Sequence, residues 1–179
     1  MELLSGGDML LRALQDEGVE YIFGIPGEEN LDMMDALLDS SIKFVTVRHE
    51  QGAAFMADVY GRLTGRAGVC MATLGPGATN LITGVADANM DRAPMLVLTG
   101  TGSSHPLHKE SHHIMDVVKM FEPVTKWGTT FINADTIPEI VRKAVRLARG
   151  EKPGAVLIEL PEDVAEHETQ ALPMKPIRY

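Results

Sequence analysis

Two hydrophobic periods alternate along the chain, and together they predict helices and strands in turn. Helical spacing of apolar residues covers residues 3–17, 31–38, 49–63, 78–90, 114–121 and 137–149. Short apolar runs predict strands at residues 21–25, 44–47, 68–73, 94–99 and 155–160. Strands that are apolar on both faces and separated by helices are typical of a parallel sheet covered on both sides. We therefore predict one doubly wound α/β domain.

Chemically distinctive residues follow three of these strands. Pro26 and Gly27 come after the first strand, Glu50 opens the helix after the second, and Gly75-Pro76-Gly77 follows the third. Ligands of doubly wound sheets bind at the carboxyl ends of the strands, where loops lead into helices. The pattern therefore predicts a binding site at this edge of the sheet.

Glu50 is the central candidate, because it is a lone carboxylate at the junction of a strand and a helix rich in small residues. Ala53, Ala54 and Ala57 would let another group pack closely against that helix. One interpretation is a carboxylate that faces a bound ring. The other is a helix N-terminal carboxylate that satisfies backbone donors and the helix dipole. Its neighbour His49 points in a different direction and is expected at the surface or an interface.

The Gly75-Pro76-Gly77 turn also has two interpretations. A strand, a glycine turn and a helix N-terminus can bind an anion, but this segment matches neither common phosphate-binding motif and can equally be a plain connection. The rigid ring of Pro76 between two glycines suits a stacked heterocycle better than a phosphate.

Composition and charge exclude several classes of partner. The formal net charge is -9 and there is no basic run, which argues against nucleic acid or an anionic membrane surface. No apolar stretch reaches the roughly 20 residues that span a bilayer, and no signal-peptide pattern begins the chain. We expect a cytoplasmic protein. The single cysteine, Cys70, lies in an apolar strand and is expected to be a buried core thiol.

Metal and acyl-transfer sites are not predicted. Four histidines, His105, His108, His112 and His113, are grouped, but no carboxylate lies at ligand spacing. There is no G-x-S-x-G turn for an acyl-transfer nucleophile.

Four segments in order resemble one family. They are residues 23–27 (FGIPG), 48–54 (RHEQGAA), 75–80 (GPGATN) and 87–94 (DANMDRAP). Together they resemble the N-terminal, pyrimidine-binding domain of thiamine-diphosphate enzymes in the acetolactate synthase (acetohydroxyacid synthase) large-subunit family. The resemblance implies a single doubly wound, mainly parallel six-stranded sheet over residues 1–163. Residues 164–179 would then be a linker toward a central domain.

The resemblance implies a role for each matching residue. Glu50 would bond a ring nitrogen of the aminopyrimidine and promote removal of the thiazolium proton, which generates the nucleophile that attacks a 2-oxo acid. The remaining matching residues would contact the pyrimidine or form the rest of the pocket wall: Ile25, Pro26, Gly27, Thr73, Gly75, Pro76, Gly77 and Asn80.

The loop after Gly100 departs from the commonest family pattern. Thr101 stands where many biosynthetic members have Gln, and His112-His113 stands where a synthase subgroup has His-Gln. An adjacent His pair is also similar to that of 2-oxo acid decarboxylases, although the context of Lys109 sides with the synthases. Thr101, Lys109, His112 and His113 are therefore candidate substrate-loop residues.

The family resemblance also implies partners. Mg²⁺ would be held by a diphosphate-binding domain of another subunit, FAD is possible in the central domain, and the enzyme would be a homodimer or homotetramer. The chain matches only the pyrimidine domain, so we expect it to be inactive alone. The implied reaction is decarboxylation of pyruvate, a small 2-oxo acid, and carboligation to 2-acetolactate. A 2-oxo acid decarboxylase half, including the split sulfopyruvate or phosphonopyruvate type, and a non-catalytic remnant stay open as alternatives.

Overall fold

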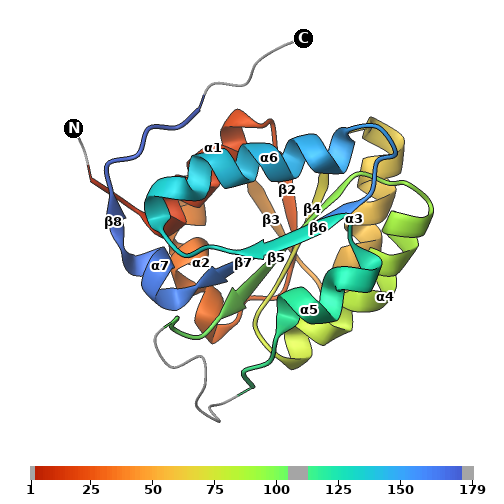
Figure 1. Cartoon of the computed structure of the whole chain (residues 1–179), viewed down its shortest axis with the longest axis horizontal. Helices are drawn as coiled ribbons and strands as arrows, with labels where there is room; N and C mark the ends of the chain where they lie inside the picture. The colour runs from red at the N-terminus through yellow and green to blue at the C-terminus, as the bar shows by residue number, and fades with distance from the viewer. Residues whose placement is uncertain (1–2, 105–112, 175–179) are drawn as a thin grey trace.

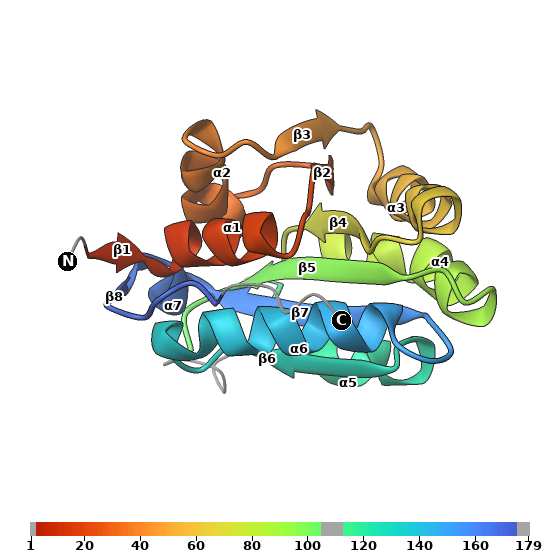
Figure 2. The same cartoon turned by 90° about the horizontal axis from the view of Figure 1, so that it is seen from above.

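The computed structural model describes residues 3–104 and 113–174, and a parallel sheet lies at its centre. Its six strands are ordered β3-β2-β4-β5-β7-β6, and every neighbouring pair is parallel. Figure 2 shows the sheet from β3 at one edge to β6 at the other. The strands are β2 (Tyr21–Gly24), β3 (Lys43–Thr46), β4 (Gly68–Ala72), β5 (Met95–Thr101), β6 (Trp127–Thr130) and β7 (Ala155–Pro161). The predicted six-stranded α/β fold is confirmed.

Helices cover both faces of this sheet (Figure 1). Alternate residues of β4 enter two separate cores, Val69 and Met71 on one face and Cys70 and Ala72 on the other. The first core is shared with α1 (Gly6–Asp16), α2 (Leu31–Leu38) and α6 (Ile137–Arg149). The second is shared with α3 (Glu50–Thr64), α4 (Pro76–Met90) and α5 (Val117–Phe121). Cys70 is fully buried, as predicted.

Several elements differ from the hydrophobic pattern. Helix α1 begins at Gly6 instead of residue 3, because residues 4 and 5 form a short strand and the Ser5 side chain caps the helix by accepting the Asp8 N–H. Strand β6 was not located by it, because its residues are all half-buried and only Trp127 is a large apolar residue. Helix α4 begins at Pro76, two residues earlier than the pattern indicates, since proline is well suited to the first helical turn. Helix α5 begins at Val117 instead of residue 114, because the Asp116 side chain caps it by accepting the Lys119 N–H at 2.9 Å.

The chain after β7 returns to its beginning. Helix α7 (Glu162–Glu166) is followed by β8 (Glu168–Thr169), which pairs antiparallel with β1 (Leu4–Ser5). Residues 164–166 and 168–169 of the expected linker therefore lie in regular structure, while the division of the chain at residue 163 stays a prediction. The described residues also form three short 3-10 turns: η1 (Glu28–Asn30), η2 (Glu122–Val124) and η3 (Ala134–Thr136). None of the helices in residues 3–104 and 113–174 is long and apolar enough to cross a membrane.

Candidate functional site

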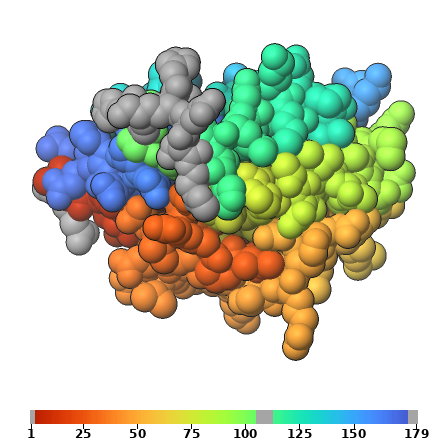
Figure 3. Space-filling view, turned by 90° about the horizontal axis from the view of Figure 1, so that it is seen from below, coloured from red at the N-terminus to blue at the C-terminus, as the bar shows by residue number. Residues whose placement is uncertain are grey.

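The segments after β2, β3 and β4 meet at one edge of the sheet, where the sequence predicted a site. Gly27 follows β2, Glu50 is the first residue of α3, and Thr73 follows β4. Figure 3 shows this face of the molecule, on which the orange-red segment after β2 lies beside α3 and the yellow-green α4. The parallel arrangement of the strands brings these loops together, because their carboxyl ends share an edge.

Glu50 does not cap its own helix. That role falls to His49, whose Nδ1 accepts the Gln51 N–H at 3.1 Å. The half-buried Glu50 instead reaches toward α4, where its Oε2 accepts a hydrogen bond of 2.9 Å from Asn80 Nδ2. Within the described ranges, we find no hydrogen bond to its second oxygen, Oε1. The carboxylate therefore joins two helices and retains one oxygen for another donor.

The Gly75-Pro76-Gly77 turn needs both of its glycines. Gly75 has a φ of 57°, which favours glycine, and a β-carbon there would lie 2.6 Å from His113 Cβ. A β-carbon at Gly77 would lie 2.9 Å from Thr73 Cγ2 and 3.6 Å from Glu50 Oε1. A side chain at residue 77 would therefore occupy the space beside the second oxygen of Glu50.

Backbone amides at the start of α4 are partly engaged. The Gly77 N–H donates to the Leu74 carbonyl at 3.2 Å, and the Thr79 N–H donates to the Gly75 carbonyl at 3.0 Å. Fewer donors are then left for a phosphate, while the exposed Pro76 ring offers a flat apolar edge. This geometry favours the heterocycle interpretation of the turn over the phosphate cradle.

Thr73 connects the β2 loop with the β4 loop. A β-carbon at Gly27 would lie 2.4 Å from Thr73 Cβ, so the two segments touch. The Thr73 hydroxyl donates to the carboxylate of Glu29 in η1. Sequence reasoning did not identify Glu29. The available signal was a pair of carboxylates, Glu28 and Glu29, directly after a Pro-Gly turn at the predicted site edge.

Turn η1 also packs on the end of β5. Asn30 is fully buried, and a β-carbon at Gly100 would lie 2.4 Å from Asn30 Oδ1. In the part of the chain that the structure describes, neither the oxygen nor the nitrogen of this side-chain amide has a hydrogen-bond partner. The close approach fixes η1, and hence Glu29, against the central strands.

The predicted site residues do not all lie together. Gly27, Thr73, Gly77, Glu50 and Asn80 form a continuous series of close approaches. His113 lies against Gly75, whereas Thr101 is buried at the end of β5, beside Pro161 of β7. Ile25 is half-buried and Pro26 is exposed, next to Gly27 in the chain. Lys109 and His112, with His105 and His108, lie outside the described residues.

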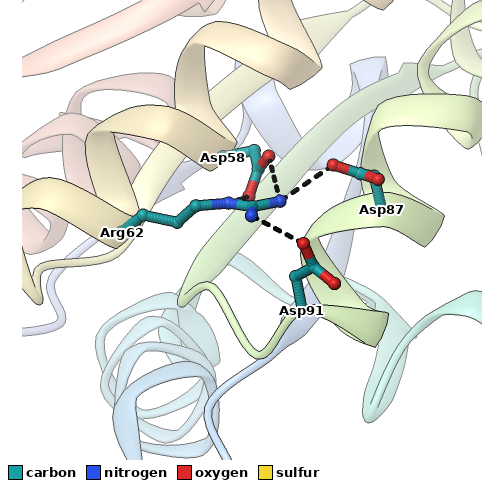
Figure 4. Close-up of polar contacts among 4 residues, drawn as sticks. All are labelled: Asp58, Arg62, Asp87 and Asp91. Atoms are coloured by element: carbon teal, nitrogen blue, oxygen red, sulfur yellow. Dashed lines mark hydrogen bonds and ion pairs between the residues drawn. The ribbon is translucent and has the colours of Figure 1, made fainter.

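The far ends of α3 and α4 are joined by an ion cluster (Figure 4). Arg62 makes two 2.8 Å hydrogen bonds to Asp58 of its own helix. Across the interface it donates to Asp87 at 2.9 Å and to Asp91 at 2.6 Å. The hydrogen bonds to Asp58 and, to a smaller extent, to Asp91 raise the pKa of Arg62 above its ordinary value. Glu50 with Asn80 and Arg62 with this cluster thus tie the two helices together at both ends.

A metal centre is not evident at this edge. Among residues 3–104 and 113–174, no group of three His, Cys, Asp or Glu side chains is arranged to hold a metal ion.

Comparison with known proteins places the chain in a family. Residues 4–120, more than half of the chain, match "Thiamine pyrophosphate enzyme, N-terminal TPP binding domain". The catabolic acetolactate synthase of Raoultella terrigena is 44% identical over 161 residues, which cover 90% of this chain and 29% of that protein. The acetolactate synthase isozyme 3 large subunit of Escherichia coli (strain K12) is 43% identical over 165 residues, 92% of this chain and 29% of that protein.

A third relative extends the match along this chain. An acetolactate synthase large subunit of Buchnera aphidicola is 41% identical over 173 residues, which cover 96% of this chain and 30% of that protein. The chain therefore spans less than a third of the length of these curated relatives. It belongs to the family of N-terminal TPP-binding domains of thiamine pyrophosphate enzymes, and its relatives there include acetolactate synthase large subunits.

Proposed function

We propose that this chain forms the half of a thiamine diphosphate site that holds the aminopyrimidine ring, in an acetolactate synthase-like enzyme. The observation that carries the proposal is the Glu50 carboxylate, with Oε2 held by Asn80 at 2.9 Å and Oε1 facing Gly77. When bound, thiamine diphosphate supplies a carbon nucleophile that adds to 2-oxo acids. The names of the relatives, which are acetolactate synthases, support the same reaction class.

The residues at this edge fit the pyrimidine ring. Glu50 Oε1 is an acceptor without a protein donor among the described residues, as a protonated ring nitrogen requires. Gly77 places no side chain beside that oxygen, and the Thr73 methyl group lies next to the same position. An apolar wall beside one carboxylate oxygen suits a flat heterocycle that has a polar edge.

Glu50 would act by holding a proton on the ring. Its Oε1 would accept a hydrogen bond from the protonated ring nitrogen and so hold a proton at that atom. This favours the imino form of the exocyclic nitrogen, which is the form that can accept the thiazolium proton. Asn80 would orient the carboxylate, because its amide donates to the opposite oxygen. Gly27 and Thr73 would shape the pocket without a chemical role.

The other half of the site would come from a partner domain. Helix α3 exposes an apolar stripe at a spacing of four residues, with Phe55 37%, Val59 50% and Leu63 81% exposed. Met56 beside it and Met90 at the end of α4 are also exposed. We propose that the diphosphate-binding domain of another subunit docks on this exposed apolar surface. That domain would hold the diphosphate through Mg²⁺. A homodimer or homotetramer, FAD in a central domain and a cytoplasmic location remain predictions.

Glu50→Gln tests the central claim. In the enzyme assembled from this chain and its diphosphate-binding domain, we expect exchange of the thiazolium proton to slow by about 10²–10⁴, the range for general acid–base groups. The glutamine oxygen can still accept the Asn80 hydrogen bond, so the fold should not change. Glu28→Gln, at an exposed carboxylate in η1, is the matched control. An unchanged exchange rate in Glu50→Gln would refute the proposed role of Glu50.

The reaction is tested by its product. Given pyruvate, the assembled enzyme should form acetolactate, and this chain alone should form none. Acetaldehyde as the sole product would establish the decarboxylase alternative instead, and turnover by the chain alone would contradict the need for a partner domain.

A further inference from the structure

We propose that Glu29 is a positioning residue for the pyrimidine pocket, which it controls through the side chain of Thr73. The inference rests on the proposed function of Glu50. It starts from the hydrogen bond in which the Thr73 hydroxyl donates to the half-buried Glu29 carboxylate. Hydrogen bonds to an ionised acceptor are stronger than neutral ones. Glu29 is therefore able to select the orientation of the threonine.

Thr73 presents two different groups from one carbon atom. Because its hydroxyl is turned to Glu29, its methyl group Cγ2 is the atom that lies nearest to Gly77. A β-carbon at Gly77 would lie 2.9 Å from this methyl group and 3.6 Å from Glu50 Oε1. The methyl group is thus the apolar wall beside the carboxylate oxygen that would bind the ring.

Loss of the Glu29 carboxylate would remove the preference of Thr73 for this rotamer. Threonine side chains occupy a few staggered rotamers, and rotation by one step places the hydroxyl where the methyl group was. A hydroxyl in that position would face Gly77 and the pocket, where it and its bound water would compete for the space of the ring. Glu29 therefore keeps a polar group out of the pocket wall.

The backbone around Glu29 is built to hold this contact. Gly27 lies against the Thr73 side chain, and buried Asn30 packs on Gly100. Turn η1 is thus fixed on both sides of Glu29. Glu28 is the natural control, because it is the adjacent carboxylate, is exposed, and has the same charge.

A double-mutant cycle in the assembled enzyme loaded with thiamine diphosphate tests the inference. Glu29→Ala should slow exchange of the thiazolium proton about tenfold in the otherwise unchanged protein. In the Thr73→Val variant, the same substitution should change the rate less than twofold, because valine presents a methyl group in either rotamer. Glu29→Gln should restore most of the rate, since its amide oxygen accepts the hydroxyl, and Glu28→Ala should leave the rate unchanged. If Glu29→Ala slows exchange by the same factor with and without Thr73→Val, the inference is overturned.

A measurement on the isolated chain separates this inference from the proposed function. Three-bond couplings of the Thr73 methyl carbon should show one rotamer in the unchanged chain and in Glu28→Ala, and averaged rotamers in Glu29→Ala. One fixed rotamer in Glu29→Ala overturns the role of Glu29 and leaves that of Glu50 standing. Averaging in Glu29→Ala together with unchanged exchange in Glu50→Gln supports the Thr73 contact and refutes the proposed function.

Discussion

Substituting Gly84 with alanine tests how closely α3 and α4 must pack to form the site. Glu50 meets Asn80, and Ala54 meets Gly84 about one helical turn later on each helix. A β-carbon at residue 84 would lie 2.6 Å from Ala54 Cβ and 3.0 Å from the Phe55 nitrogen. The contact between Ala54 and Gly84 therefore sets the helix spacing beside the Glu50–Asn80 hydrogen bond.

The magnitude follows from these distances. Carbon atoms are best separated by about 3.5–4.0 Å, so Gly84→Ala must push α4 away from α3 by roughly 1 Å. Overpacking of this kind costs about 1–3 kcal/mol. Alanine has a helix propensity about 1 kcal/mol better than glycine, which offsets part of that cost. The net loss in the free energy of unfolding should be about 0–2 kcal/mol.

Gly52→Ala is the control that isolates the steric part. Gly52 also lies in a helix, α3, but a β-carbon there would meet nothing within 4 Å. The free energies of unfolding of the two variants, measured by chemical denaturation, should differ by about 1–3 kcal/mol. Each kcal/mol corresponds to a difference of about 2–4 °C in Tm. The side-chain amide signals of Asn80 should shift in Gly84→Ala alone. Equal stabilisation by both substitutions would refute the close packing.

Two further predictions concern buried groups. Burial raises the pKa of Glu159 against the opposing hydrogen bond from Thr130, and the charge of Asp116 adds to the rise. Between the ordinary and the raised pKa, the folded chain therefore keeps a proton that the unfolded chain loses. The free energy of unfolding should therefore fall as pH rises from the ordinary glutamate pKa to the raised one. Glu159→Gln should remove that fall in denaturation at several pH values, and an unaltered pH dependence would contradict it. Burial raises the pKa of the Cys70 thiol to about 12. A thiol reagent at pH 8 should therefore modify Cys70 readily in the unfolded chain and very slowly in the native chain. Rapid labelling of native Cys70 would disprove this.

The hydrophobic period located helices α1 to α6 and five strands of the main sheet, but it did not locate the short helix α7. Strands such as β4 and β5 are apolar on both faces and fully buried, so their sequence carries a strong signal. Strand β6 lies at an edge of the sheet and is only half-buried. Its residues Gly128, Thr129 and Thr130 show no strong period, because packing on β7 and α5 decides their structure and the local pattern does not.

The small residues of α3 show what the sequence leaves open. Ala53, Ala54 and Ala57 predicted that some group packs closely on this helix, and all three are fully buried. The structure identifies two of the neighbours as protein: Ala54 meets Gly84 of α4, and Ala57 lies against Gly68 at the start of β4. A sequence can indicate close approach, but the identity of the approaching group depends on long-range packing.

The position of Glu50 follows from that packing and not from its own helix alone. At the start of an isolated helix, a carboxylate would have backbone donors within reach, yet His49 takes the capping role here and Glu50 turns to Asn80. The turn is possible because α3 and α4 approach at Ala54 and Gly84 and are joined again at Arg62. The Ala54–Gly84 contact one turn away and the Arg62 cluster at the far end thus bring Asn80 within reach of the carboxylate, and Thr73 and Gly77 determine what lies beside its other oxygen.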